Sequence, residues 1–166
     1  YGEYRKKDLI EYGVTGILAK SCGLRVDSRK LDPFYFYNDI EFSIPLGSKG
    51  SLYEQFMVRQ SEIKESIQII FKLFDNLPVK NKAKEHTLQH LLQECPGLLI
   101  GQNIEKSNGL CNLTLLSQGN KKERLLVRSP DFNQTQFISN HLKGLKPFQV
   151  HQIGKGLGLS PLEIDR

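Results

Sequence analysis

The 166-residue sequence predicts an α+β fold that combines one long bundle helix with a small antiparallel β meander. The helix is indicated by a start signal at Ser51 and by apolar residues that recur at helical spacing as far as Leu77. The meander is indicated by short apolar runs that turn-forming residues separate. These runs cover residues 98–100, 110–116 and 125–128.

The composition is that of a globular protein, because 39% of the residues are hydrophobic and 25% are charged. A chain of this length can bury roughly 70% of the surface that it exposes when unfolded, so a self-sufficient domain is allowed. No apolar run approaches the roughly 18 residues of a membrane helix, and we expect no transmembrane segment. The first residue is Tyr1, so we expect any targeting segment to have been removed.

The N-terminal part, residues 1–78, begins with a short helix that Gly13 closes. Glycine and proline then interrupt the pattern as far as Gly50, and the aromatic cluster at 34–37 is either a strand or a loop laid across another surface. We expect so long a loop to be functional or to pack on something else. Charged residues at 27–32 could form ion pairs at an interface.

The long helix starts with a capping box, in which the Ser51 side chain accepts from an N–H of the first turn and Glu54 accepts from the Ser51 N–H. It can extend to Leu77, because Pro78 disfavours helical dihedrals at the residue before it. A single core-facing stripe is expected from the apolar positions Leu52, Phe56, Ile63, Ile67, Ile70, Phe74 and Leu77. The last two turns are apolar on nearly every side, as in a helix buried in a bundle larger than this chain can readily build. The additional apolar residues there are Ile69, Phe71 and Leu73.

The remaining sequence divides into three parts. Residues 79–97 are a basic linker with a weaker helix over about 83–92, residues 98–130 are the meander, and residues 131–166 are a helix around 135–143 followed by a glycine-rich tail. Within the meander, the turns are expected at Asn108-Gly109 and at residues 118–120.

Candidate ligand-binding motifs are weak. His86 and His90 have the i, i+4 spacing at which two imidazoles can share a metal ion, but no third ligand accompanies them, so we interpret them as solvated side chains. Residues 154–158 are rich in glycine, but they match neither of the nucleotide-binding motifs G-x-x-x-x-G-K-[ST] and G-x-G-x-x-G. The isolated His141 and His151 are expected to pack in the core or at the surface.

The cysteines Cys22, Cys95 and Cys111 lie far apart in the sequence and are odd in number, which favours a reducing compartment. They argue against a structural zinc site or an iron–sulfur cluster held by this chain alone. No nucleophile, base and orienting group can be assembled with any specificity, so we do not expect the chain to be an enzyme by itself.

The net charge of +5, from 23 basic and 18 acidic residues, is spread over short clusters without interleaved aromatic residues. Nucleic-acid binding is therefore not expected, because such proteins concentrate positive charge on one face. An anionic protein partner is at least as compatible with this charge.

Several stretches resemble one known family. The central one is Asp27-Ser-Arg-Lys-Leu-Asp-Pro33, followed by Tyr37, Phe42, Pro45, Gly47, Gly50, Tyr53, Arg59, Glu62, Ser66, Ile69 and Ile70, and closing at Leu77-Pro78. The flanking ones are Tyr12-Gly-Val-Thr-Gly16 with Gly23, Arg128-Ser-Pro130 with Phe132, and Glu163-Ile-Asp-Arg166. Together they resemble the quinone-site subunit of NADH:ubiquinone oxidoreductase (respiratory complex I), the 49-kilodalton subunit or subunit 7, which is related to nickel–iron hydrogenase large subunits. Lys20 stands where this family usually has arginine.

The resemblance implies that the chain is the C-terminal half of a split subunit and forms an incomplete half of a hydrogenase-large-subunit-like fold. Its expected partners are a chain that carries the N-terminal half and other subunits of the hydrophilic arm. In the family, the absent half carries the residues thought to meet the quinone headgroup, so none of those roles is assigned to this sequence.

The resemblance also implies that the C-terminal tail lines the quinone cavity. Glu163 retains the glutamate of the family, whereas Ser160 stands in place of a valine and Gly158 in place of an aspartate. We expect no cofactor to be bound by this chain alone, with a quinone and an iron–sulfur cluster nearby in the complex.

The leading hypothesis is a structural half of the quinone module of proton-translocating NADH:ubiquinone oxidoreductase. Its expected location is the matrix-facing peripheral arm at the mitochondrial inner membrane, although the sequence does not distinguish a mitochondrion from a plastid. The alternative is a free-standing basic binding module from the same family, which would be a soluble monomer. A hydrogenase-type metal subunit is disfavoured, because no terminal CxxC pair exists to bind nickel and iron.

Overall fold

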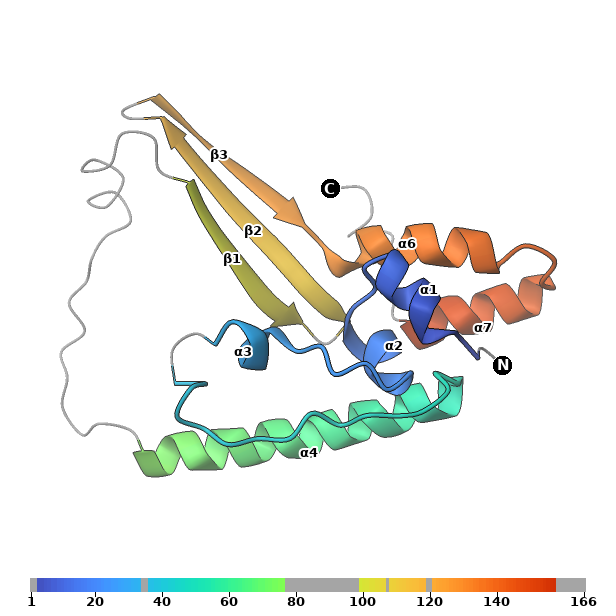
Figure 1. Ribbon diagram of the computed structural model, residues 1–166, viewed down its shortest axis with the longest axis horizontal. Helices are drawn as coiled ribbons and strands as arrows, with labels where there is room; N and C mark the ends of the chain where they lie inside the picture. The colour runs from blue at the N-terminus through green and yellow to red at the C-terminus, as the bar shows by residue number, and fades with distance from the viewer. Residues whose placement is uncertain (1–2, 34–35, 77–98, 107, 119–120, 158–166) are drawn as a thin grey trace.

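The computed structural model describes residues 3–33, 36–76, 99–106, 108–118 and 121–157 (Figure 1). Its helices are α1 (Lys6–Glu11), α2 (Gly16–Ser21), α3 (Ser28–Leu31), α4 (Leu52–Asn76), α6 (Pro130–His141) and α7 (Pro147–Leu157). Its strands are β1 (Leu99–Lys106), β2 (Gly109–Gln118) and β3 (Lys121–Arg128). The strands form an antiparallel sheet in the order β1-β2-β3, so the predicted α+β fold with a meander is confirmed.

The sheet extends away from a group of helices, and α4 lies along one side of the molecule (Figure 1). The central core is formed by α1, α2, α6 and α7 around Phe137, whose side chain is fully buried. Tyr4 and Tyr12 pack on the Phe137 ring with centroid distances of 5.4 and 5.8 Å. The other buried members of this core are Leu9, Val14, Leu18, Cys22, Ile138 and Ile153.

The capping box at the start of α4 is confirmed. The Glu54 N–H donates to the Ser51 Oγ at 3.3 Å, and the Ser51 N–H donates to a Glu54 carboxylate oxygen at 3.2 Å. The same carboxylate also accepts from the N–H groups of Ser48 and Lys49, both at 3.0 Å. Glu54 therefore fixes both the first turn of the helix and the loop that leads into it.

Within the described residues, the predicted apolar stripe of α4 does not face the core of this chain. The residues predicted to face the core at positions 56, 63, 67, 70 and 74 are between 48% and 67% exposed. The buried side instead carries Val58 and Ile69, and Ile69 packs with Ile40 and Phe42 from the extended segment beside the helix. Since residues of an α-helix follow each other at about 100°, these two apolar stripes lie about 140° apart around α4. Periodicity identifies both stripes but cannot tell which one this chain covers.

Three helices were not expected from the sequence. The short helices α2 and α3 lie in the stretch interpreted as irregular, and α7 lies where a glycine-rich tail was predicted. All residues of α2 are buried, so its stability comes from packing rather than from intrinsic helix propensity. The predicted helix at 135–143 exists as α6 but begins earlier, because Pro130 occupies its first turn, where a missing N–H has no cost.

We predict that replacing Phe137 with alanine lowers the free energy of opening of α6 by about 3–5 kcal/mol, because it removes a fully buried ring from the central core. Hydrogen–deuterium exchange of the α6 amides measures this change. The matched control is Phe148→Ala, since the Phe148 side chain is 65% exposed and its removal should change the opening free energy little. Equal effects of the two substitutions would contradict the assigned core.

We predict that the Glu54→Gln substitution removes an acid-dependent component of stability. Hydrogen bonds from Ser48, and then from the backbone of Lys49 and Ser51, lower the pKa of Glu54 from 4.5 to about 2. Because the pKa is depressed in the folded state, this contribution is present above pH 4.5 and is lost as the pH falls towards 2. Urea unfolding midpoints over this range should therefore depend less on pH in Glu54→Gln, whereas the exposed control Glu11→Gln should keep the wild-type profile.

Candidate functional site

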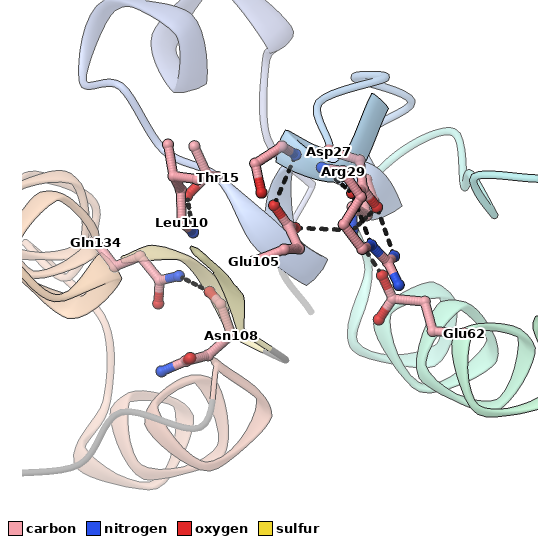
Figure 2. Close-up of polar contacts among 10 residues, drawn as sticks. Thr15, Asp27, Arg29, Glu62, Glu105, Asn108, Leu110 and Gln134 are labelled. Carbon is pink, nitrogen blue, oxygen red and sulfur yellow. Dashed lines mark hydrogen bonds and ion pairs between the residues drawn. The ribbon is translucent and has the colours of Figure 1, made fainter. Parts of the chain in front are cut away.

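The most concentrated group of polar contacts surrounds the ammonium of Lys20, which is only 2% exposed. Its Nζ lies 2.8 Å from Glu62, 3.0 Å from Glu105 and 3.1 Å from Asp27. Figure 2 shows the three carboxylates converging on one region of the molecule. An ammonium group has three donors, so these three contacts satisfy it completely.

The members of this network come from four elements. Lys20 belongs to α2, Asp27 is the N-cap of α3, Glu62 lies in the middle of α4, and Glu105 lies near the end of β1. The second oxygen of the Glu105 carboxylate accepts from the Ser28 N–H at 3.0 Å, which attaches β1 to the start of α3. The Lys20 ammonium thus holds α2, α3, α4 and the sheet, through β1, in fixed relative positions.

Asp27 is also paired with Arg29. The charged residues at 27–32 were expected to form ion pairs at an interface, whereas this pair lies within the chain. The Arg29 guanidinium donates to both carboxylate oxygens of Asp27, at 2.9 and 2.7 Å, and the Arg29 N–H donates to one of them at 3.1 Å. The guanidinium carbon also lies 5.0 Å from the centre of the Phe42 ring. This two-point contact orients Asp27 for Lys20.

The charges of the network stabilise one another. Burial by itself would lower the pKa of Lys20, but Glu105, Glu62 and Asp27 together raise it above its usual value. Burial would likewise raise the pKa of Asp27, but the hydrogen bond from Arg29 and the charge of Lys20 hold it below its usual value. The contribution of Asp27 is therefore lost as the pH falls through its depressed pKa, and that of Lys20 is lost as the pH rises through its elevated pKa.

All three protons of the Lys20 ammonium are already donated to carboxylates, so this ammonium is not free to bind a substrate. Among the residues that the structure describes, no group of three or more histidines, cysteines, aspartates and glutamates is arranged to hold a metal ion. Burial raises the pKa of the Cys22 thiol to about 11, so this thiol is a neutral core side chain. The network is therefore suited to a structural role.

A pocket of about 400 Å³ opens next to the network along α4. Lys20, Glu62 and Glu105 contribute to its charged floor, and apolar side chains of α4 form one wall. The lining residues on α4 are Arg59, Glu62, Ile63, Ser66, Ile67 and Ile70. The pocket therefore lies between the buried and the exposed stripes of the helix.

The exposed stripe continues beyond this pocket. We call it the outer face of α4 and define it by Phe56, Ile63, Ile67, Ile70 and Phe74. These side chains are 48–67% exposed. A contiguous row of large, exposed apolar side chains is uncommon on the surface of a monomeric protein and typically marks an interface. The outer face and the pocket together are the candidate functional surface of the chain.

A second group of hydrogen bonds holds the turn between β1 and β2 against the helices (Figure 2). The Leu110 N–H donates to the Thr15 Oγ1 at 2.8 Å, and the Gln134 side chain donates to the carbonyl of Asn108 at 2.6 Å. A Cβ on Gly16 would collide with that carbonyl group, and the φ of Gly16 is +74°. Only glycine at position 16 allows the two backbone segments to come this close together. Their contact positions one end of the sheet.

Most of the sequence-predicted site residues lie outside the described residues. These are the tail positions Gly158, Ser160 and Glu163, the histidines His86 and His90, and Cys95. His141 packs on the Phe137 ring with a centroid distance of 4.1 Å, and His151 is exposed on α7. Gly154 lies on α7 rather than in a phosphate-binding loop.

The Lys20 network was missed by sequence reasoning. Its members are separated by up to 85 positions, so no local spacing reveals them. One signal was present, because Lys20, Asp27 and Glu62 all fall within the stretches that carry the family resemblance. The sequence alone did not show that these positions share one buried site.

Comparison with known proteins relates the chain to subunits of respiratory enzymes. A family model described as the 49 Kd subunit of respiratory-chain NADH dehydrogenase matches residues 1–166. The D subunit of NADH-quinone oxidoreductase from Ehrlichia canis (strain Jake) is 30% identical over 188 residues, covering 99% of this chain and 48% of that protein. The C/D subunit of the same enzyme from Pseudomonas fluorescens (strain SBW25) is 33% identical over 164 residues, covering 85% of this chain and 28% of that protein.

Among solved structures, a chain of the membrane-bound sulfane sulfur reductase, an archaeal respiratory membrane complex, matches with a TM-score of 0.87 and 28% identity. The match covers 99% of this chain and 46% of that one. The chain thus spans about half the length of the Ehrlichia proteins that it matches.

We predict that Lys20→Met destabilises the protein by about 3–5 kcal/mol, because it leaves three buried or partly buried carboxylates without their common cation. The matched control is Lys49→Met, which removes a cation paired at 3.6 Å with Glu3 when both side chains are largely exposed. That substitution should cost about 1 kcal/mol or less. Urea unfolding of both variants near neutral pH measures the difference, and similar losses would contradict a supporting role for Lys20.

Proposed function

The chain belongs to the family of the 49-kilodalton subunit of respiratory-chain NADH dehydrogenase, and we propose on this basis that it is a structural part of the quinone module of such a complex. In this role it supports the transfer of electrons from NADH through iron–sulfur clusters to ubiquinone in a proton-translocating enzyme. It provides scaffold rather than redox groups, which agrees with the saturated Lys20 network.

The observation that carries this proposal is the outer face of α4. Ile63, Ile70 and Phe74 are 61%, 50% and 67% exposed, although the same helix buries its opposite apolar stripe in this chain. Covering a large apolar side chain contributes up to about 1.5–3 kcal/mol, so a partner that covers the whole row would gain several kcal/mol. A helix with two apolar stripes is suited to a position between two layers of a bundle.

The proposed occupant of the outer face is the remainder of the family fold. The Ehrlichia relatives are about twice as long as the matched chain, so they contain enough additional sequence to form another layer. We propose that a second polypeptide carries this N-terminal half and that α4 packs in the bundle between the two halves. The pocket beside Ile67 would be filled by side chains of that layer.

Further parts of the proposal follow from the resemblance. The C-terminal tail, with Gly158, Ser160 and Glu163, would line one side of the quinone chamber, with a quinone and an iron–sulfur cluster nearby. The chain would lie in the peripheral, matrix-facing arm at the mitochondrial inner membrane, together with other hydrophilic-arm subunits. Within the described ranges, no helix combines the length and the apolar character that crossing a membrane requires.

The alternative of a free-standing basic binding module is less well supported. A soluble monomer would have to expose the outer face of α4 to water permanently, which favours aggregation. Two of its cations, Lys20 and Arg29, are engaged with carboxylates and would not contribute to the cationic surface that such a module needs. These observations favour a chain that functions with its apolar surface covered.

We predict that Ile67→Glu separates the chain from its partners, because it places a charge in the middle of the outer face. The matched control is Gln68→Glu, which introduces the same charge at the next, exposed position on the polar side of the helix. Affinity purification of the tagged full chain, followed by identification of the other subunits, measures the effect. Ile67→Glu should reduce their recovery at least about tenfold, since burying an unpaired charge is costly, and Gln68→Glu should leave it unchanged.

Two results would contradict this proposal. If the wild-type chain recovers no other subunit of a respiratory complex, the proposed function is wrong. If Ile67→Glu recovers the same subunits as the wild type, the outer face of α4 is not the surface that the other half covers.

A further inference from the structure

The strand β3 presents apolar side chains on both of its faces. Successive side chains of a strand point to opposite sides, so Leu126 lies on one face and Leu125 and Val127 lie on the other. These side chains are 45%, 61% and 52% exposed. A strand of a sheet with one buried face would alternate between apolar and polar residues, whereas β3 has the continuous apolar run of a strand that is covered on both sides.

Among the described residues, the backbone of β3 pairs with a strand on one side only. The sheet order is β1-β2-β3, so among the described residues no strand pairs with the outer edge of β3. The opposite edge of the sheet differs, because β1 packs against α3 and its Glu105 is anchored in the Lys20 network. The unpaired N–H and carbonyl groups of an edge strand are a template for another strand.

Arginines flank the apolar centre of β3. Arg124 and Arg128 are exposed and lie on the same face as Leu126, two positions to either side of it. The Arg128 side chain donates to Asn133 at 2.9 Å, and its guanidinium carbon lies 4.8 Å from the centre of the Phe132 ring. Arg128 is therefore held in place before any partner binds, which reduces the entropy lost on binding.

These arginines disfavour pairing between two copies of β3. In a symmetric antiparallel pair centred on Leu126, Arg124 of each copy would lie directly opposite Arg128 of the other. Like charges directly opposite each other destabilise a strand pair, so the edge is protected against self-association. The same two charges favour a partner strand that has acidic residues at these positions.

We infer that the outer edge of β3 is a docking site for an extended strand of another protein, with the pattern acidic–apolar–apolar–apolar–acidic. The backbone of that strand pairs with the free edge of β3. Its two acidic residues lie opposite Arg124 and Arg128, and its apolar residues cover Leu125, Leu126 and Val127 on both faces. A helix would not satisfy these observations, because it covers only one face and leaves the backbone unpaired.

This surface is separate from the outer face of α4, so the two assignments can fail independently. The β3 edge requires a partner segment that is extended and carries acidic residues. It does not require that this partner belong to a respiratory complex. Loss of the α4 interface in Ile67→Glu would leave the sequence specificity of β3 unchanged.

The test is photo-crosslinking in the native assembly. The full-length tagged chain carries the substitution Leu125→p-benzoylphenylalanine, which the exposed position should tolerate. After irradiation, the cross-linked peptide is sequenced. The expected result is a segment of another protein with acidic residues that flank three apolar ones. A cross-link to this chain or to a second copy, to a segment without that pattern, or to no protein at all would overturn the inference.

Charge reversal tests the specificity of the same contact. Arg124→Glu should lower the yield of the cross-linked product about tenfold, and Arg124→Lys should retain most of it, because the positive charge is what the acidic partner recognises. The matched control is Lys143→Glu, an exposed charge reversal on the turn after α6 that should leave the yield unchanged. Equal yields from Arg124→Glu and the wild type would overturn the role assigned to the arginines.

Discussion

The buried ammonium of Lys20 is the constraint on which the arrangement of the described elements depends. A charge that is 2% exposed is tolerated only when ion pairs and hydrogen bonds replace its hydration. Here Asp27, Glu62 and Glu105 replace it from three different elements, at 2.8–3.1 Å. Moving any one of these elements would leave an unpaired charge inside the protein. Hydrophobic packing alone would allow α4 and β1 to shift, whereas the network fixes a single register between them.

This constraint also determines which side of α4 remains open. Glu62 must point towards Lys20, and the helix then turns Val58 and Ile69 towards the extended segment and α2. The second apolar stripe, about 140° away, cannot face the same neighbours. The outer face is therefore a consequence of the internal ion pairs rather than of a loosely packed helix. A partner that covers it meets a helix whose rotation is already set.

The sequence was sufficient for features that depend on neighbouring residues. The capping box of Ser51 and Glu54 located the start of α4, and the turn-forming Asn108-Gly109 located the hairpin of β1 and β2. The sequence was insufficient for features that depend on contacts between residues far apart in the chain. Both apolar stripes of α4 have helical periodicity, and only the packing of Ile69 on Ile40 and Phe42 selects one of them. The short helix α2 has no strong local signal because it is stabilised by burial, and the burial of Lys20 depends on carboxylates up to 85 positions away.

The polar and apolar surfaces of the chain therefore have different roles in recognition. The buried charged groups Lys20 and Asp27 are paired with each other inside the chain and are not available to a partner. The remaining exposed apolar surfaces on α4 and β3 supply the free energy of association, which depends on area and is not selective. Selectivity must then come from charges at their margins. On β3, Arg124 and Arg128 provide it by opposing a second copy and favouring an acidic strand. On α4, the pocket beside Glu62 and Arg59 provides a shaped and charged boundary that a correct partner layer has to match.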